Sequence, residues 1–286
     1  MQQIYRWRGA DGEWVFSDRR QQDRPAENLS NRYRANEQFA RVQVRGEGSR
    51  FPDQIRSVIG NDVQQMSRIL RDALDLPVRQ IDLDIVLYGD RDAFRASSGD
   101  ATSLSANVRG FYQSRTNMVA ILELPGFEAT RRVARHEASH AMLQGMYGST
   151  PVWLNEGLAE VMTRLEVTGQ LRELTVHTAH AATVKRRLGG GTGELARLLR
   201  HDHASWRASA ADATYPFAWS LVHELLRDAH GRALLRAVLD AQAAAPCRHI
   251  DSEALVRAHY PGGFRALEER WLRQAGTGNW GAALRF

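Results

Sequence analysis

Two histidines four residues apart are the side chains in this sequence best placed to do chemistry. The segment reads His136-Glu137-Ala138-Ser139-His140. Residues four apart lie on the same face of a helix, so both imidazoles can bind one cation, and Zn²⁺ is the usual occupant. Glu137 projects beside that cation, where it can take a proton from a zinc-bound water. The alternative is a polar helix face whose histidines pair with neighbouring side chains.

A catalytic zinc site also needs a third protein ligand and an open position. The segment from Pro151 to Glu160 contains two glutamates, Glu156 and Glu160, that are one helical turn apart. If this segment is a second helix packed on the first, Glu156 reaches the two histidines. Glu160 then accepts the second N–H of a ligand histidine and fixes its tautomer. A solvated acidic helix face is the alternative for this pair.

Helix-end signals lie between the two segments. We expect Gly145 and Gly148 to end the first helix. We expect Ser149 or Thr150 to cap the second helix, with Pro151 near its first turn.

This region resembles the gluzincin metallopeptidases, in which H-E-x-x-H is followed by a glutamate in the pattern W-L-N-E-G on a second helix. Here that pattern is Trp153-Leu154-Asn155-Glu156-Gly157, and the resemblance, closest to small bacterial peptidase-MA-like proteins, covers about residues 110–166. It implies zinc ligands His136, His140 and Glu156, general base Glu137 and supporting residue Glu160. Fifteen residues separate His140 from Glu156, fewer than in the large aminopeptidases of the family.

The resemblance also implies a tyrosine that opens a later helix and donates a hydrogen bond to the oxyanion of the reaction. Tyr215 is the matching residue, and a neutral phenol can act as this donor. The alternative is a tyrosine that only packs at a helix N-terminus. His223 is a second candidate, although its apolar helix favours a histidine of the core.

Other potential ligands carry weaker signals. His201-Asp202-His203 has a spacing that suits a strand or a loop, and we interpret it as a solvated loop. His177 and His180 give a still weaker indication. Cys247 is the one cysteine, so a disulfide within the chain is excluded, and we interpret it as a buried or partly buried thiol rather than a nucleophile.

The composition is that of a globular protein, with 43% hydrophobic and 25% charged residues and a net charge of +5. The arginines are dispersed rather than clustered with aromatic residues, so no nucleic-acid partner is predicted. An anionic envelope surface remains an alternative partner. No apolar run reaches the length of a transmembrane segment.

Residues 4–18 predict a β-hairpin, because β-prone segments flank Asp11-Gly12. The hairpin, with Trp7, Gly12 and Phe16, resembles a short N-terminal module of bacterial envelope proteins. That resemblance implies a periplasmic or secreted protein, although we find no signal-peptide pattern in the chain. A plain docking hairpin is the alternative.

Hydrophobic periodicity predicts the elements around the zinc helix. We expect a helix from Phe51 to Leu74, a half-buried strand from Ile81 to Leu87, a short helix within residues 90–98 and a second strand over 117–122. The resemblance implies that strand 117–122 is an edge strand, along which an extended peptide or protein substrate binds by β-augmentation. An ordinary edge strand is the alternative. After Glu166 the periodicity is largely helical.

We therefore predict an α+β protein, with a zincin-like domain of a small mixed sheet and the H-E-x-x-H helix, followed by a mainly helical C-terminal half. The expected divisions are a hairpin module (1–19), a linker or arm (20–49), a zincin-like subdomain (50–168) and a helical subdomain (169–286). The predicted activity is zinc-dependent peptide hydrolysis. A cell-wall peptide amidase and a non-catalytic zinc-bearing envelope adaptor are the alternatives.

Overall fold

The computed structural model describes residues 5–9, 14–17, 20, 25–28, 40–76, 81–99, 104–188, 193–209, 211–246 and 248–286. The chain forms two compact units, Met1–Gln38 and Phe39–Phe286, which are described separately.

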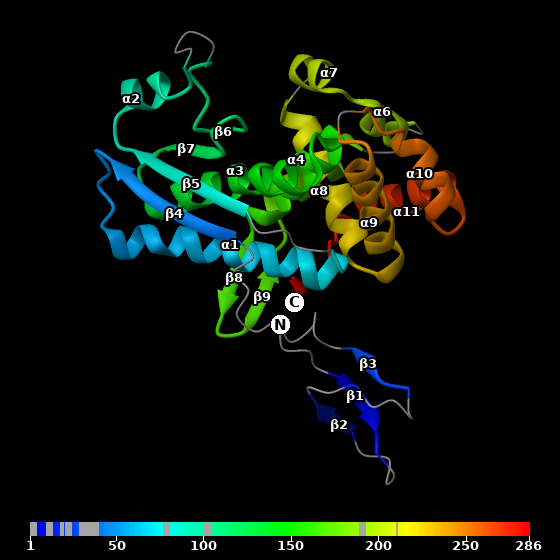
Figure 1. Ribbon diagram of the computed structural model, residues 1–286. Helices are drawn as coiled ribbons and strands as arrows, with labels where there is room; N and C mark the ends of the chain where they lie inside the picture. Colours follow the sequence, from blue (N-terminus) through cyan, green and yellow to red (C-terminus); the bar gives the residue numbers. More distant parts are fainter. Residues whose placement is uncertain are drawn as a thin grey trace. The chain divides into compact units, whose positions relative to one another are not determined.

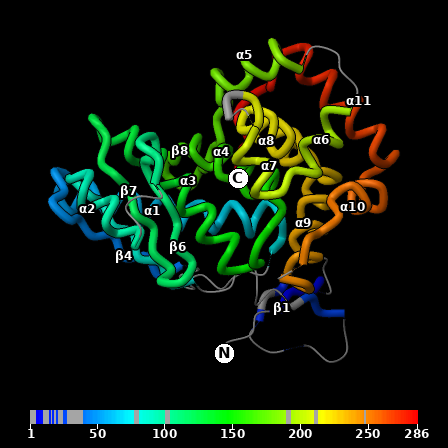
Figure 2. The backbone as a smooth tube through the Cα atoms, turned by 90° about the horizontal axis from the view of Figure 1, so that it is seen from above, coloured from blue at the N-terminus to red at the C-terminus, as the bar shows by residue number. Residues whose placement is uncertain are grey.

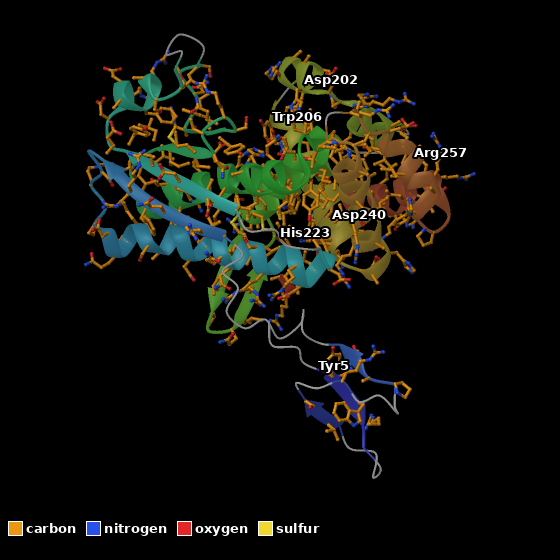
Figure 3. The ribbon with its side chains drawn as sticks, in the orientation of Figure 1. Tyr5, Asp202, Trp206, His223, Asp240 and Arg257 are labelled. Carbon is orange, nitrogen blue, oxygen red and sulfur yellow. The ribbon has the colours of Figure 1, made fainter. Side chains whose placement is uncertain are left out.

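The first unit confirms the predicted hairpin. Strand β1 (Tyr5–Arg8) pairs antiparallel with β2 (Trp14–Ser17), and β3 (Glu27–Asn28) pairs with the other edge of β1. Tyr5, on β1, is buried within this unit (Figure 3). The predicted turn at Asp11-Gly12 lies outside the described residues.

The second unit contains a four-stranded mixed sheet in the order β4-β5-β7-β6. Its strands are β4 (Ala40–Glu47), β5 (Ile81–Tyr88), β6 (Gly110–Gln113) and β7 (Met118–Leu122). The first two run parallel to each other, β7 runs parallel to β5, and β6 is antiparallel to β7. The assignment of residues 20–49 to a linker is therefore wrong for 40–47, where apolar residues alternate with polar ones in a partly buried strand.

The prediction that strand 117–122 is an edge strand is wrong, because β7 lies between β5 and β6. The prediction fails because a tight turn connects β6 to β7, so that β6 pairs with the outer side of β7. Asn117 adopts a positive φ of 51° in this turn, and its side chain donates to the carbonyl of Asp82 on β5 and accepts from the Tyr112 hydroxyl at 3.0 Å. The edge next to β7 is therefore occupied by β6.

Helices cover both faces of this sheet (Figure 1). Side chains such as Ile85 and Ile121 belong to the main core with α1 (Asp53–Leu74) and α3 (Phe127–Tyr147). Their neighbours Val86 and Ala120 pack with Phe94 of α2 (Arg91–Ala96) in a second apolar cluster. The predicted helices and strands are confirmed here, but β5 is buried on both faces in its second half rather than half-buried.

The rest of the second unit is mostly helical, as predicted, and Figure 2 shows these helices gathered on one side of the sheet. After α4 (Val152–Met162) comes an unpredicted hairpin of β8 (Leu165–Thr168) and β9 (Leu171–Leu174), which pairs with β10 (Leu284–Arg285). The helices that follow are α5 (Thr178–Arg187), α6 (Glu194–Arg200), α7 (His203–Ala208), α8 (Ala211–Leu226), α9 (Ala229–Ala244), α10 (Ser252–His259) and α11 (Gly263–Thr277).

The fold class is α+β with a mainly helical C-terminal half, as the sequence predicts. Within the described parts of the chain, no helix combines the length and the apolar character needed to cross a membrane.

Candidate metal centre

Two helices, α3 and α4, carry the predicted site. Helix α3 ends at Tyr147 with Gly148 as its C-cap at φ 79°, so Gly145 lies inside the helix rather than at its end. Pro151 occupies the N-cap position of α4 without a side-chain hydrogen bond, so neither Ser149 nor Thr150 caps this helix as expected.

The structure brings the three predicted ligands together. The Nε2 atoms of His136 and His140 lie 3.4 Å and 3.6 Å from Oε2 of Glu156. The two imidazole rings meet edge to face, with centroids 4.7 Å apart and planes at 89°. The ligand atoms of all three residues lie within 4.8 Å of one another, so they can hold a metal ion.

The chemistry of these donors fits a zinc ion. Oε2 of Glu156 and Nδ1 of His140 are buried and have no hydrogen-bond partner among the described residues. A buried carboxylate oxygen without a donor is costly, and a cation at this point would remove the cost. Two imidazole nitrogens and one carboxylate oxygen are also a donor set found in catalytic zinc sites with three protein ligands.

Glu160 lies behind one of these ligands, where the sequence predicts it. Its Oε1 is 3.2 Å from Nδ1 of His136, the ring nitrogen on the side away from Glu156. Its Oε2 is 2.9 Å from Nε2 of His180. Burial alone would raise the pKa of Glu160, but its contacts with the two histidines outweigh burial and hold that pKa well below its usual range. Glu160 therefore remains ionised and orients His136.

His180 and His177 were only weakly indicated by the sequence, and their place beside Glu160 depends on the packing of α5. Their i,i+3 spacing at a helix start was the one available signal, since Nδ1 of His177, the N-cap residue, accepts from the backbone N–H of His180. With Glu160 they form a second group of ligand atoms within 4.8 Å of one another. However, the two rings stack at 3.7 Å with planes only 8° apart, so their in-plane lone pairs run parallel rather than toward one point. We interpret this group as support for Glu160.

Glu137 lines a cleft of about 390 Å³ beside the metal ligands, together with His136, Glu160, His177 and the start of β6. Burial is the main cause that raises the pKa of Glu137 above its ordinary value. Strand β6 approaches this carboxylate closely because its first residue is a glycine. A Cβ atom on Gly110 would lie 2.8 Å from Cγ of Glu137 and 2.7 Å from Cγ1 of Val133.

Tyr215 lies near the centre, in the second turn of α8 rather than at its start. Its ring centroid is 6.3 Å from that of His136 and 5.3 Å from that of Trp206 on α7, which Figure 3 labels. Burial, and then the charge of nearby glutamates, raises the pKa of Tyr215 to about 12, so the phenol is neutral and can donate. Helix α8 reaches this position because Gly157 of α4 allows close contact: a Cβ there would lie 2.5 Å from the carbonyl oxygen of Ala218.

The remaining candidates do not join this centre. Asp202 caps α7 by accepting from the backbone N–H of Ser205 at 2.7 Å, and neither His201 nor His203 belongs to a group of metal donors within the described residues (Figure 3). His223 is fully buried, with Trp219 and Trp280 at ring distances of 5.2 Å and 5.9 Å.

The second-candidate role given to His223 is therefore not favoured, and its interpretation as a core histidine is the better one. Cys247 lies outside the described residues.

Comparison of the chain with protein-family models and with curated proteins found no match in either case.

Proposed function

We propose that this protein is a zinc metallopeptidase of the gluzincin type. The observation that carries the proposal is the convergence of His136, His140 and Glu156, with an unpaired Glu156 oxygen between the two Nε2 atoms, next to a cleft that contains Glu137. A metal that serves only structure requires no carboxylic acid of raised pKa in an adjoining cleft.

Zinc, when bound, would lower the pKa of a water molecule and polarise the carbonyl of the scissile bond. The Glu137 carboxylate accepts the proton of the attacking water and then donates it to the leaving amine nitrogen. Its raised pKa suits the first part of this role, because a carboxylate of higher pKa is a stronger proton acceptor. Tyr215 donates a hydrogen bond to the oxyanion. Glu160 holds the ring of His136 in a fixed orientation.

The substrate in this proposal is an extended peptide that pairs with the edge of β6. This strand, and not β7, has an unpaired edge in the described sheet, and Gly110 lines the cleft with Glu137. Backbone N–H and C=O groups on a free edge can bind a peptide main chain by β-augmentation. The substrate would thereby be held beside the proposed base.

The envelope-type hairpin favours action outside the cytoplasm, in the periplasm or after secretion. Strand β1 with Trp7 pairs with β2, the arrangement that the resemblance of the first unit implies. The hairpin also motivates the second candidate function, an amidase that acts on cell-wall peptides. A non-catalytic zinc-bearing adaptor is a third candidate, and the presence of Glu137 in the cleft argues against it.

Replacement of Glu137 by glutamine tests the catalytic part of the proposal. The amide keeps the shape of the side chain but cannot accept a proton, so we expect zinc content to persist and hydrolysis of a peptide library to fall by about 10²–10⁴-fold. Glu269→Gln, at a 50% exposed position on α11, serves as the matched control and should retain activity. Persistent hydrolysis in Glu137→Gln would show that another group is the base.

A further inference from the structure

An arginine lies about one helical turn from the metal centre along each of its two segments. Arg132 precedes His136 by four residues on α3, and Arg164 follows Glu160 by four residues, in the turn after α4. Because His140 meets only Glu156 whereas His136 meets both glutamates, the two helices cross the site in opposite directions. The two arginines therefore lie at the same end of the site.

A second cavity, of about 360 Å³, lies at that end. Arg132 and Arg164 both line it, together with Thr163. Arg132 and Thr163 also line the cleft that contains Glu137. The cleft of the proposed active site therefore adjoins a pocket that has four arginines in its wall.

Some charged side chains of this pocket have ion-pair partners and others have none among the described residues. Arg131 and Arg135, which also line it, are bound to the buried Asp62 at 2.6 Å and 2.8 Å, and Glu128 is paired with Arg131 at 3.0 Å. These residues neutralise one another.

By contrast, neither Arg132 nor Arg164 forms an ion pair with any residue that the structure describes, and Nε of Arg164 is buried without a hydrogen-bond partner there. The other acid in the wall, Glu166, is exposed and lies opposite Glu173 in the β8–β9 hairpin. Arg132, which is exposed, and Arg164, which is half-buried, thus have no ion-pair partner among the described residues, and both line the pocket next to the proposed active site. A buried guanidinium N–H without an acceptor is costly, and an anionic ligand in this pocket would supply the acceptor.

We propose that Arg132 and Arg164 bind a carboxylate of the substrate, so that the enzyme selects acidic peptides. This inference rests on the proposed peptidase function and adds a substrate class to it. A guanidinium group presents a planar fork of donors that matches a carboxylate. The carboxylate belongs either to an Asp or Glu side chain near the scissile bond or to the C-terminus of the peptide.

Binding of labelled peptides tests the pocket without any need for catalysis. The probes are fluorescent decapeptides with a single Glu moved through each position, their Gln counterparts, and the same Gln peptides with a free or an amidated C-terminus. Fluorescence anisotropy measures their affinity for zinc-loaded Glu137→Gln protein. We expect one register of Glu, or the free C-terminus, to bind about tenfold or more tightly than its neutral counterpart. The arm that shows the difference identifies the source of the carboxylate.

The same probes are then measured with Arg132→Gln, Arg164→Gln and the double substitution in the Glu137→Gln background. Arg273→Gln, at a 70% exposed position of α11, is the matched control. We expect the acidic preference to fall in each single variant, to disappear in the double variant and to persist in the control. Zinc content and far-ultraviolet circular dichroism show whether each variant keeps the fold.

Equal affinity for the Glu and Gln peptides in the parent protein would overturn the inference, as would an acidic preference that survives the double substitution. Cleavage by the wild-type protein is scored separately. If acidic peptides bind through these arginines but no peptide is cleaved, the pocket stands and the peptidase proposal fails. If peptides are cleaved with no acidic preference, the peptidase proposal stands and the pocket fails.

Discussion

Helix α3 has two polar faces, and they differ in whether the buried carboxylate opposite them is fully hydrogen-bonded. On one face, Arg131 and Arg135 meet Asp62 of α1, and both carboxylate oxygens of Asp62 accept hydrogen bonds at 2.6–2.8 Å. On the other face, His136 and His140 meet Glu156 at 3.4 Å and 3.6 Å, and its Oε2 accepts no hydrogen bond among the described residues. The charges of the first face are neutralised within the chain, whereas the ligand atoms of the second face could hold a cation.

The comparison shows which buried polar groups hold the fold and which serve a ligand. The arginine face joins α3 to α1 beneath the sheet, and the hydrogen bond with Asp62 raises the pKa of Arg131 despite burial. For the more deeply buried Arg135, burial outweighs the same contact and lowers its pKa. On the histidine face Glu160 contacts His136 and His180, but Oε2 of Glu156 has no hydrogen-bond donor among the described residues. The geometry of this face is retained at a cost that a bound metal removes.

Removal of Asp62 should give the largest effect on stability. Asp62→Asn leaves the buried Arg135 without a counter-charge and Arg131 with Glu128 alone, so we expect the free energy of unfolding to fall by about 3–5 kcal/mol in urea denaturation. Asp240→Asn on α9 is the control: Asp240 is 55% exposed and 3.5 Å from Arg236, and its loss should cost less than about 1 kcal/mol (Figure 3). Equal stability of the two variants would contradict the claim that the arginine face stabilises the fold.

His223 is a third case. Among the described residues its buried ring nitrogens have no hydrogen-bond partner, and it belongs to no group of metal donors. Burial lowers its pKa to about 4 from the usual 6.5, so the folded state binds fewer protons than the unfolded state between these values. The free energy of unfolding should therefore fall as pH drops from 6.5 toward 4, by up to about 3 kcal/mol from this residue.

The measurement is chemical denaturation at pH 7 and at pH 4, for wild type and His223→Gln, both with chelator. The variant should lose less stability than wild type over this range. Equal losses would show that His223 is protonated in the folded protein.

Glu160→Gln should have a smaller effect, confined to the histidine face. The substitution weakens the contact that orients His136, so we expect zinc affinity to fall by about 10–100-fold. Competition with a chromogenic chelator measures the affinity, with Glu269→Gln as the control. Unchanged affinity would mean that Glu160 does not support the ligand.

The sequence predicted what depends on spacing along one element. Such spacing predicted the i,i+4 histidines, the W-L-N-E-G segment and the long periodic helix α1. It also predicted strand 118–122. Strand β4 was missed because Val42 and Val44 alternate within a strongly polar stretch. The edge position of β6 and its turn depend on the positive φ of Asn117, which one sequence does not reveal.

Features that depend on packing between distant segments were not predictable. Asp62 is 69 residues from Arg131, and His180 reaches Glu160 only through the packing of α5. The same is true of the pocket lined by Arg132 and Arg164, whose residues come from α3 and from the segment that follows α4. Long-range pairing of charges is set by the tertiary fold and leaves no local periodicity in the sequence.

Metal content tests the central claim most directly. Purified wild-type protein and His140→Ala, each stripped with chelator and dialysed against zinc, are analysed by elemental mass spectrometry and titration calorimetry. We expect about one tightly bound zinc ion per wild-type chain and its loss in the variant. Absence of zinc from the wild-type protein, or equal binding by His140→Ala, would contradict it.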